Sequence, residues 1–221
     1  MNFLGHLRQL QEMTAKVYGR PTSAMTTRYE VDGKPVIFIH NPQTGGTSLG
    51  RALGVKRRSH ATAADRIREN FWLKTFSVVV VREPFDRFAS SYYGTVMPEQ
   101  PVNGLVKMYG PEIKNLTPFE FLDLLKIEPR FGGSQLQYVS FPSETKPCAD
   151  LILRFEEIKN WPETLAFNGL NVANFNLPHV NSKKNKPKNI MDILEVNERQ
   201  LKALREMVRI QFAQDYEVLG Y

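Results

Sequence analysis

The chain is 221 residues long, which fits one domain, and 42% of its residues are hydrophobic, enough for a sizeable core. Its formal net charge of +6 favours anionic partners such as a phosphorylated cofactor, an acidic substrate or nucleic acid. The single cysteine, Cys148, excludes an internal disulfide and argues against a cysteine-based zinc site. No apolar run reaches the ~18 residues of a membrane span, and the N-terminus lacks the apolar core of a signal peptide. We therefore expect a cytoplasmic location.

The first third of the chain is predicted to alternate between helix and strand. Residues 1–30 are expected to form a short helical arm. The β-branched run at 36–40 predicts a buried strand, and the run from 47 to 54 is compatible with a helix. Residues 61–70, rich in Ala, Arg and Glu, predict another helix. Residues 76–81 are almost continuously apolar, which indicates a strand buried on both faces, as in a parallel sheet.

The rest of the chain adds three helices and one strand to this prediction. A helix is expected over 85–93, followed by a Pro/Gly-punctuated surface excursion from 95 to 116. The residues at 117–120, Thr-Pro-Phe-Glu, form a good helix start, with a capping hydroxyl followed by proline and then by glutamate at the third helical position. Residues 150–155 predict a third strand, and residues 195–214 have the apolar spacing of a long helix.

This order of elements predicts the fold class. Strands alternate with helices, and candidate ligand-binding segments come directly after two of the strands. Such an order is typical of a three-layer α/β fold with a central parallel sheet. We expect residues 1–221 to form a single domain of this class.

The segment from Ile39 to Ser48, with sequence IHNPQTGGTS, is the most informative in the chain. A strand that turns through two glycines into a helix leaves backbone N–H groups pointing outward, and these groups favour a phosphate or sulfate. Gly45 and Gly46 allow the ligand to approach the backbone, while Thr47 adds a hydroxyl donor. The alternative is a glycine-rich turn that binds nothing.

A second motif, from Val81 to Tyr93, follows the strand at 76–81. Arg82 is expected at the carboxyl end of this strand, where open α/β sheets bind ligands, and Ser90 lies two helical turns further on. An arginine and a serine can clamp a phosphate group. The alternative is a surface arginine paired with Asp86 and a capping serine. Arg87 is expected to be structural, bridging to Glu83 or Asp86, and Tyr92 and Tyr93 are expected in the core.

The two motifs together resemble the PAPS-dependent sulfotransferases, and among them the carbohydrate group that includes heparan sulfate 2-O-sulfotransferase and its smaller microbial relatives. In that family a strand–PKTGGTS–helix loop holds the 5′-phosphosulfate, and an R-[DE]-P-x-x-R-x-x-S-x-Y segment holds the 3′-phosphate. The acidic element Arg154-Phe155-Glu156 and the ending with Asp215-Tyr216 and Gly220-Tyr221 are also similar to the microbial members. The resemblance runs from about residue 36 to the C-terminus.

The resemblance implies a P-loop-NTPase-like fold, PAPS as the cofactor without a metal, and a hydroxyl acceptor, most simply a carbohydrate. His60, between the motifs, would be the general base. Arg82 and Ser90 would hold the 3′-phosphate, and a basic loop with Lys183 and Lys184 would close over the adenine, although such a charge run is usually only a solvated face. The phosphosulfate would be held by Pro42, Gln43, Thr44, Gly45, Gly46, Thr47 and Ser48.

Gln43 departs from the family pattern, which has a lysine at this position of the loop. That lysine donates to the oxygen bridging sulfur and phosphorus, where negative charge develops. Gln43 can donate only a neutral hydrogen bond, and charge-assisted bonds are worth about 1.5–3 kcal/mol against about 0.5–1.5 for neutral ones. Three explanations remain open: another cation such as Lys56, Arg57 or Arg58 replaces the lysine, the enzyme is slow, or the protein binds PAPS without transferring sulfate.

Two further functions are weighed against the sulfotransferase. A nucleotide kinase is disfavoured because the loop lacks the lysine of a GxxxxGK[ST] motif. A nucleic-acid binder would explain the positive charge, but the basic residues are scattered and no recognition motif is present. No clustered His and carboxylate set calls for a metal. We therefore expect neither a nucleic-acid partner nor a metal ion.

Overall fold

The computed structural model of the chain describes residues 28–31, 33–55, 62, 75–96, 106, 109–127, 132–140, 144, 146–172 and 189–221. Several predictions concern residues outside these ranges. They include most of the helical arm at 1–30, most of the helix at 61–70, His60, which is expected to be the general base, and the two lysines of the basic loop, Lys183 and Lys184.

A four-stranded sheet forms one half of the described structure, with the order β1-β2-β3-β4. The strands are β1 (Arg28–Val31), β2 (Lys34–Ile39), β3 (Phe76–Val81) and β4 (Leu151–Arg154). Strands β2, β3 and β4 run parallel, as predicted, whereas β1 is an antiparallel edge strand, so the sheet is mixed. Residues 28–30, placed by prediction at the end of the helical arm, belong to β1; that boundary was wrong.

Both faces of the sheet are covered, which gives the three layers that were predicted. Successive strand residues point to opposite faces. Helices α2 (Gly46–Ala52) and α8 (Trp161–Phe167) pack on the face with Val78 and Val80. A 3₁₀ helix, η4 (Phe155–Asn160), connects β4 to α8. Helices α7 (Leu136–Val139) and α11 (Ala213–Leu219) pack on the face with Val79 and Val81. This burial on both faces explains why β3 is apolar throughout.

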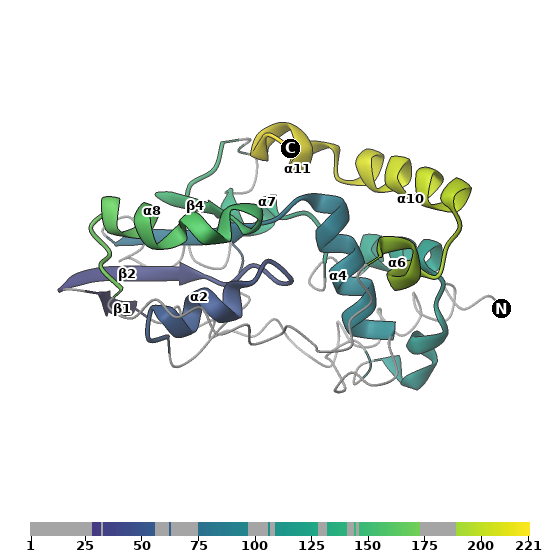
Figure 1. The fold of residues 1–221 in the computed structure, drawn as a ribbon, viewed down its shortest axis with the longest axis horizontal. Helices are drawn as coiled ribbons and strands as arrows, with labels where there is room; N and C mark the ends of the chain where they lie inside the picture. The colour runs from purple at the N-terminus through teal and green to yellow at the C-terminus, as the bar shows by residue number, and fades with distance from the viewer. Residues whose placement is uncertain are drawn as a thin grey trace.

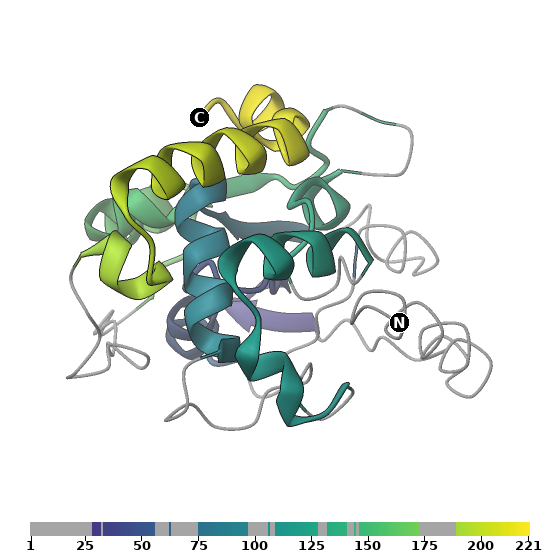
Figure 2. The same cartoon turned by 90° about the vertical axis from the view of Figure 1, so that its right-hand side faces the viewer.

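A helical cluster lies beyond the carboxyl ends of the parallel strands (Figure 1). It consists of α4 (Pro84–Val96), the 3₁₀ helix η2 (Pro111–Asn115), α6 (Pro118–Ile127), α9 (Ile190–Leu194) and α10 (Glu198–Gln211). Helix α10 crosses over α4, as the second view shows (Figure 2). Aromatic side chains of α4 and α6 fill the interior, with Phe88 and Tyr92 both against the ring of Phe121. The strand ends that carry the two motifs therefore face this cluster.

Two predicted segments differ from the structure. The described part of the expected surface excursion at 95–116 is packed into the helical cluster, with Ile113 fully buried and Leu116 5% exposed. The expected long helix at 195–214 is two helices, α10 and α11, because the backbone leaves helical geometry at Phe212. The predicted helix start at Thr117 is confirmed: Glu120 N–H donates to Thr117 Oγ1 and Thr117 N–H donates to Glu120 Oε2.

Within the described ranges, no helix is long and apolar enough to cross a membrane.

Candidate anion-binding site

The β2–α2 loop, residues 40–48, is held from beneath by buried polar contacts. Asn41 and Thr44 are almost fully buried, and Thr44 Oγ1 donates to the Asn41 carbonyl at 2.9 Å. Arg87 of α4 is 3% exposed, and its Nε donates to the Pro42 carbonyl at 2.9 Å. The loop is therefore fixed to the underlying helix before it reaches its two glycines.

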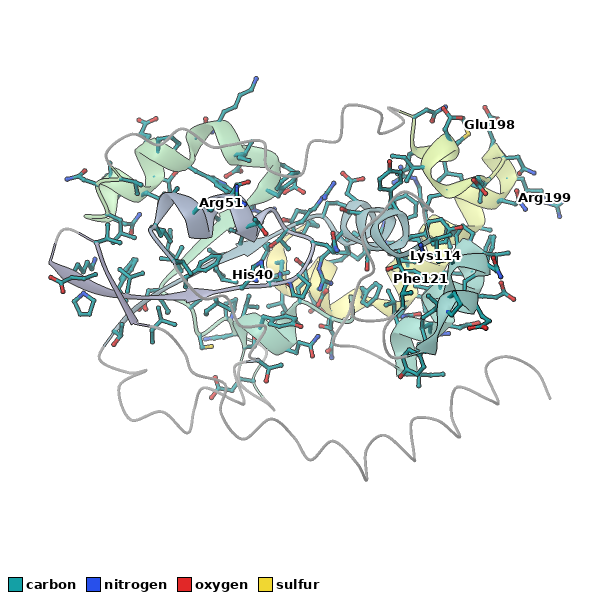
Figure 3. All side chains as sticks on the ribbon, turned by 90° about the horizontal axis from the view of Figure 1, so that it is seen from below. His40, Arg51, Lys114, Phe121, Glu198 and Arg199 are labelled. Carbon is teal, nitrogen blue, oxygen red and sulfur yellow. The ribbon has the colours of Figure 1, made fainter. Side chains whose placement is uncertain are left out.

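Any residue other than glycine would be destabilising at the Gly45-Gly46 turn. Gly45 has φ +78°, and a Cβ built there would lie 2.7 Å from the ring of Phe155. A Cβ on Gly46 would lie 2.6 Å from the ring of His40, which sits at the end of β2 (Figure 3). The Ser48 N–H donates to the Gly45 carbonyl at 2.9 Å, but in the described chain no backbone hydrogen bond uses the N–H of Gly46 or Thr47. Both N–H groups remain available to a ligand.

Arg82 lies at the carboxyl end of β3 and reaches the loop. Its guanidinium stacks on Phe155 with the Cζ 4.5 Å from the ring centroid, and Nη1 donates to the Gln43 carbonyl at 3.4 Å. Its Nε is buried and has no hydrogen-bond partner among the described residues. Burial lowers the pKa of Arg82, while the charges of Asp86, Glu156 and Glu83 act against this shift. The guanidinium is thus partly desolvated beside the loop.

Ser90 of α4 also contacts Gln43 of the β2–α2 loop. Ser90 Oγ donates to the Gln43 side-chain Oε1 at 3.3 Å, and Gln43 itself is exposed. The structure therefore brings Arg82 and Ser90 together on one residue of the β2–α2 loop. Gln43 has φ +63°, a left-handed conformation that is uncommon for a residue other than glycine. Such strained residues cluster at functional sites.

The contacts of this segment differ from some of the predicted pairings. Among the described residues the one ion pair within 4 Å is Lys126–Asp123, so a close Arg82–Asp86 pair is not present. Arg87 is structural, as predicted, but its predicted carboxylate partners were wrong. It donates to the carbonyls of Pro42 and Gly133, because a buried guanidinium needs several acceptors. Tyr92 and Tyr93 are buried in the core, as predicted.

The C-terminal segment contacts the residue that follows Arg82. Tyr216 O–H donates to Glu83 Oε1 at 2.7 Å, and the Glu83 N–H donates to Glu156 Oε1 at 2.8 Å. Tyr221 O–H donates to the other oxygen of Glu156 at 3.2 Å. Burial and Glu83 raise the pKa of Tyr216, so this hydroxyl stays a hydrogen-bond donor. These contacts place the ending noted in the sequence directly beside the Arg82 segment.

Three buried polar residues near the site are hydrogen-bonded to one another, and the sequence analysis did not predict this set: Asn41, Gln135 and Asp215. Asn41 Nδ2 donates to Gln135 Oε1 at 3.0 Å, and the Gln135 N–H donates to Asp215 Oδ2 at 2.8 Å. Asp215 had been noted only as part of the C-terminal ending. A single sequence gives no signal for Gln135, since nothing distinguishes a buried glutamine from an exposed one.

A hollow of about 550 Å³ lies next to the site, between the start of α4 and helices α9, α10 and α11. Its walls mix acidic, basic and apolar side chains: Glu83, Met191, Glu198, Leu201, Lys202, Arg205, Glu206, Arg209 and Tyr216. It shares Glu83 and Tyr216 with the contacts described above but does not include the glycine turn. Within the part of the chain that the structure describes, no group of His, Cys, Asp and Glu could hold a metal ion.

Comparison of the chain with protein-family models, curated proteins and solved structures gave no significant match.

Proposed function

We propose that the chain is a PAPS-dependent sulfotransferase with a P-loop-NTPase-like fold. It transfers a sulfuryl group to a hydroxyl, on a carbohydrate acceptor, in the cytoplasm and without a metal. The observation that carries the proposal is the convergence of Arg82 and Ser90 on Gln43. By resemblance, these segments would hold the two ends of one bisphosphorylated adenosine, and the contact of Arg82 Nη1 with the Gln43 carbonyl at 3.4 Å supports this.

The residues present fit PAPS. The N–H groups of Gly46 and Thr47 are available to the phosphosulfate, together with the Thr47 hydroxyl, whereas Thr44 Oγ1 donates to the Asn41 carbonyl. Arg82, whose Nε lacks a partner in the described chain, and Ser90 would hold the 3′-phosphate. Lys183 and Lys184, outside the described residues, stay a prediction for the adenine side.

PAPS supplies an activated sulfuryl group to such a site. The chain would orient the acceptor hydroxyl in line with the sulfur, and His60, which lies outside the described residues, would take its proton. The loop N–H groups would stabilise the negative charge that develops on the leaving 5′-phosphate as the bridging S–O bond breaks and the acceptor O–S bond forms, while Arg82 would hold the 3′-phosphate at the other end of the molecule. Gln43 would donate a neutral hydrogen bond there.

A second candidate is a protein that binds PAPS without transferring sulfate. One observation favours it: Gln43 stands where the family has lysine, and its carboxamide oxygen accepts from Ser90. Lys56, Arg57 and Arg58, which could replace the lysine, lie outside the described residues.

Calorimetric titration with PAP, the desulfated product, tests the proposed site. We expect PAP to bind, and Arg82→Ala to weaken it by about 10–100-fold, because a charge-assisted hydrogen bond is worth about 1.5–3 kcal/mol. The control is Arg199→Ala, which removes the same charge from the far end of α10 (Figure 3). Absence of PAP binding, or equal loss in both variants, contradicts the proposal. Magnesium-dependent ATP turnover or salt-sensitive binding to generic DNA would support the rival functions instead.

Sulfate transfer by the parent chain and by Gln43→Lys separates the enzyme from the binder. A restored cation at the bridging oxygen is expected to raise the rate by about 10–100-fold. If both proteins bind PAP and neither transfers sulfate to any carbohydrate offered, the chain is a binder.

A further inference from the structure

One buried side chain contacts both segments of the candidate site. Gln135, at the start of α7, has no exposed surface. Its Oε1 accepts from the Arg82 N–H at 3.0 Å, and its Nε2 donates to the Arg82 carbonyl at 2.7 Å. The carboxamide therefore pairs with both polar groups of the Arg82 peptide backbone, as a neighbouring strand would do.

The same carboxamide reaches the other segment. Its Oε1 also accepts from Asn41 Nδ2 at 3.0 Å, and Asn41 Nδ2 lies 3.1 Å from the Val80 carbonyl as well. Asn41 directly precedes Pro42, and its own carbonyl accepts from Thr44 Oγ1. One glutamine thus connects the base of the β2–α2 loop to the residue that carries the guanidinium.

Gln135 is itself anchored by the C-terminal helix. Asp215 of α11 accepts from the Gln135 N–H at 2.8 Å and from Ser134 Oγ at 2.5 Å. Asp215 is 1% exposed, and burial raises its pKa while these hydrogen bonds act against the shift. The buried carboxylate of Asp215 is therefore stabilised by its hydrogen-bond donors, Ser134 and Gln135. Removing this carboxylate would break the hydrogen bonds that hold the start of α7 to α11.

We infer that Gln135 is a positioning residue that sets the separation between the β2–α2 loop and Arg82. The inference rests on the proposed function in so far as one ligand must contact both segments. A ligand held at two points loses affinity when their spacing drifts, because a hydrogen bond weakens when its donor and acceptor leave the normal distance range. Among the hydrogen bonds of the described chain, Gln135 is the one side chain that is bonded to both Asn41 and Arg82.

The variant Gln135→Glu tests the inference without changing side-chain size. An ionised carboxylate accepts from Asn41 and from the Arg82 N–H but cannot donate to the Arg82 carbonyl. A neutral carboxylic acid can do both. Burial favours the neutral acid, so acid pH should restore the contact. The charged groups that bear on this position include the carboxylate of Asp215, which accepts from the Gln135 N–H, the guanidinium of Arg87, which acts on Asp215, and the guanidinium of Arg82, whose peptide group Gln135 contacts. The parent chain, measured at each pH, corrects for their titration.

Two readouts are needed. The first is the PAP dissociation constant of the variant divided by that of the parent. We expect this ratio to be at least about tenfold at a pH of about 8 and to fall towards one at about 5.5. The second is amide hydrogen exchange, which needs no ligand: both the 40–48 and the 79–83 segments should exchange faster in the variant at the higher pH. The control, Gln211→Glu, makes the same change at a glutamine bonded to the Leu122 carbonyl in the helical cluster.

The possible outcomes are distinct. Unchanged PAP affinity, or a loss that acid pH does not reverse, overturns the inference. So does faster exchange at 79–83 alone, because the two segments would then not be coupled. If the parent binds no PAP, the proposed function fails, yet joint loosening of both segments in Gln135→Glu and in neither segment of Gln211→Glu would still support the positioning role.

Discussion

Gly45→Ala is the perturbation for which the structure gives the clearest magnitude. Gly45 has φ +78°, where an L-residue with a Cβ is disfavoured by about 1–2 kcal/mol. In addition, the new methyl would lie 2.7 Å from two ring carbons of Phe155, well inside the usual contact distance. Relieving such an overlap in a packed site costs about 1–3 kcal/mol. The expected loss in the free energy of unfolding is therefore about 2–5 kcal/mol.

Gly54→Ala separates the two contributions. Gly54 follows α2 with φ +70°, nearly the same backbone conformation, but a Cβ there would meet nothing within 4 Å. It should lose only the backbone part, about 1–2 kcal/mol. In a Phe155→Leu background, Gly45→Ala should approach the same value, because the smaller side chain can move away.

Urea unfolding of the parent, the three single variants and the Gly45→Ala, Phe155→Leu double variant gives these free energies, and PAP titration gives the consequence for the site. Gly45→Ala should weaken PAP binding, because the loop must shift away from Phe155 and Arg82, whereas Gly54→Ala should leave it unchanged. Equal destabilisation by Gly45→Ala and Gly54→Ala would refute the close approach of Phe155 to the turn. Unchanged PAP affinity in Gly45→Ala would refute the assignment of this turn to the ligand.

Two predictions concern elements outside the site. Thr117→Ala removes the capping hydroxyl of α6 and should lower the free energy of unfolding by about 1 kcal/mol, or about 2–4 °C in Tm, with Thr117→Ser as a control that keeps the cap. Burial raises the pKa of Tyr92 to about 12, so above pH ~10 an unfolded tyrosine loses its proton before the native one does, and stability falls as pH rises. Tyr92→Phe should therefore lose stability less steeply between about pH 10 and 12, as followed by urea midpoints, and an identical slope would contradict the burial of this hydroxyl.

The parts of the fold that could be predicted are those with a local signal. The apolar run at 76–81 is buried on both faces, so its composition alone indicates β3 at its observed bounds. The helix start at Thr117 follows from residue types three positions apart. Arg82 could be placed at a strand end because a strand signal precedes it. Each of these predictions depends on residues that are neighbours in the sequence.

The parts that could not be predicted depend on contacts between distant residues. Phe155 and Gly45 are in contact at the carboxyl ends of the parallel strands, although 110 positions separate them in the sequence. The Gln135 N–H at the start of α7 donates to Asp215 of α11, and neither residue has a local sequence pattern that marks it as buried. The edge strand β1 has only four residues, and its antiparallel pairing with β2 is set by the turn at Gly33, where φ is +75°. Hydrophobic periodicity cannot predict such pairings, because it describes the pattern within one segment and not its contacts with another.

Under the proposed function, Arg82 is the cation of the described residues that can meet an anion at the β2–α2 loop, because Gln43 carries no charge. Two arginines of the described chain contact the β2–α2 loop through hydrogen bonds, Arg82 and Arg87. Arg87 is 3% exposed and donates to carbonyls of Pro42 and Gly133, so its charge serves the fold beneath the loop. Arg82 is only partly buried, and its one hydrogen bond to the loop is 3.4 Å long. An incoming anion can therefore recruit Arg82 at small cost, since it replaces a weak contact with a charge-assisted one.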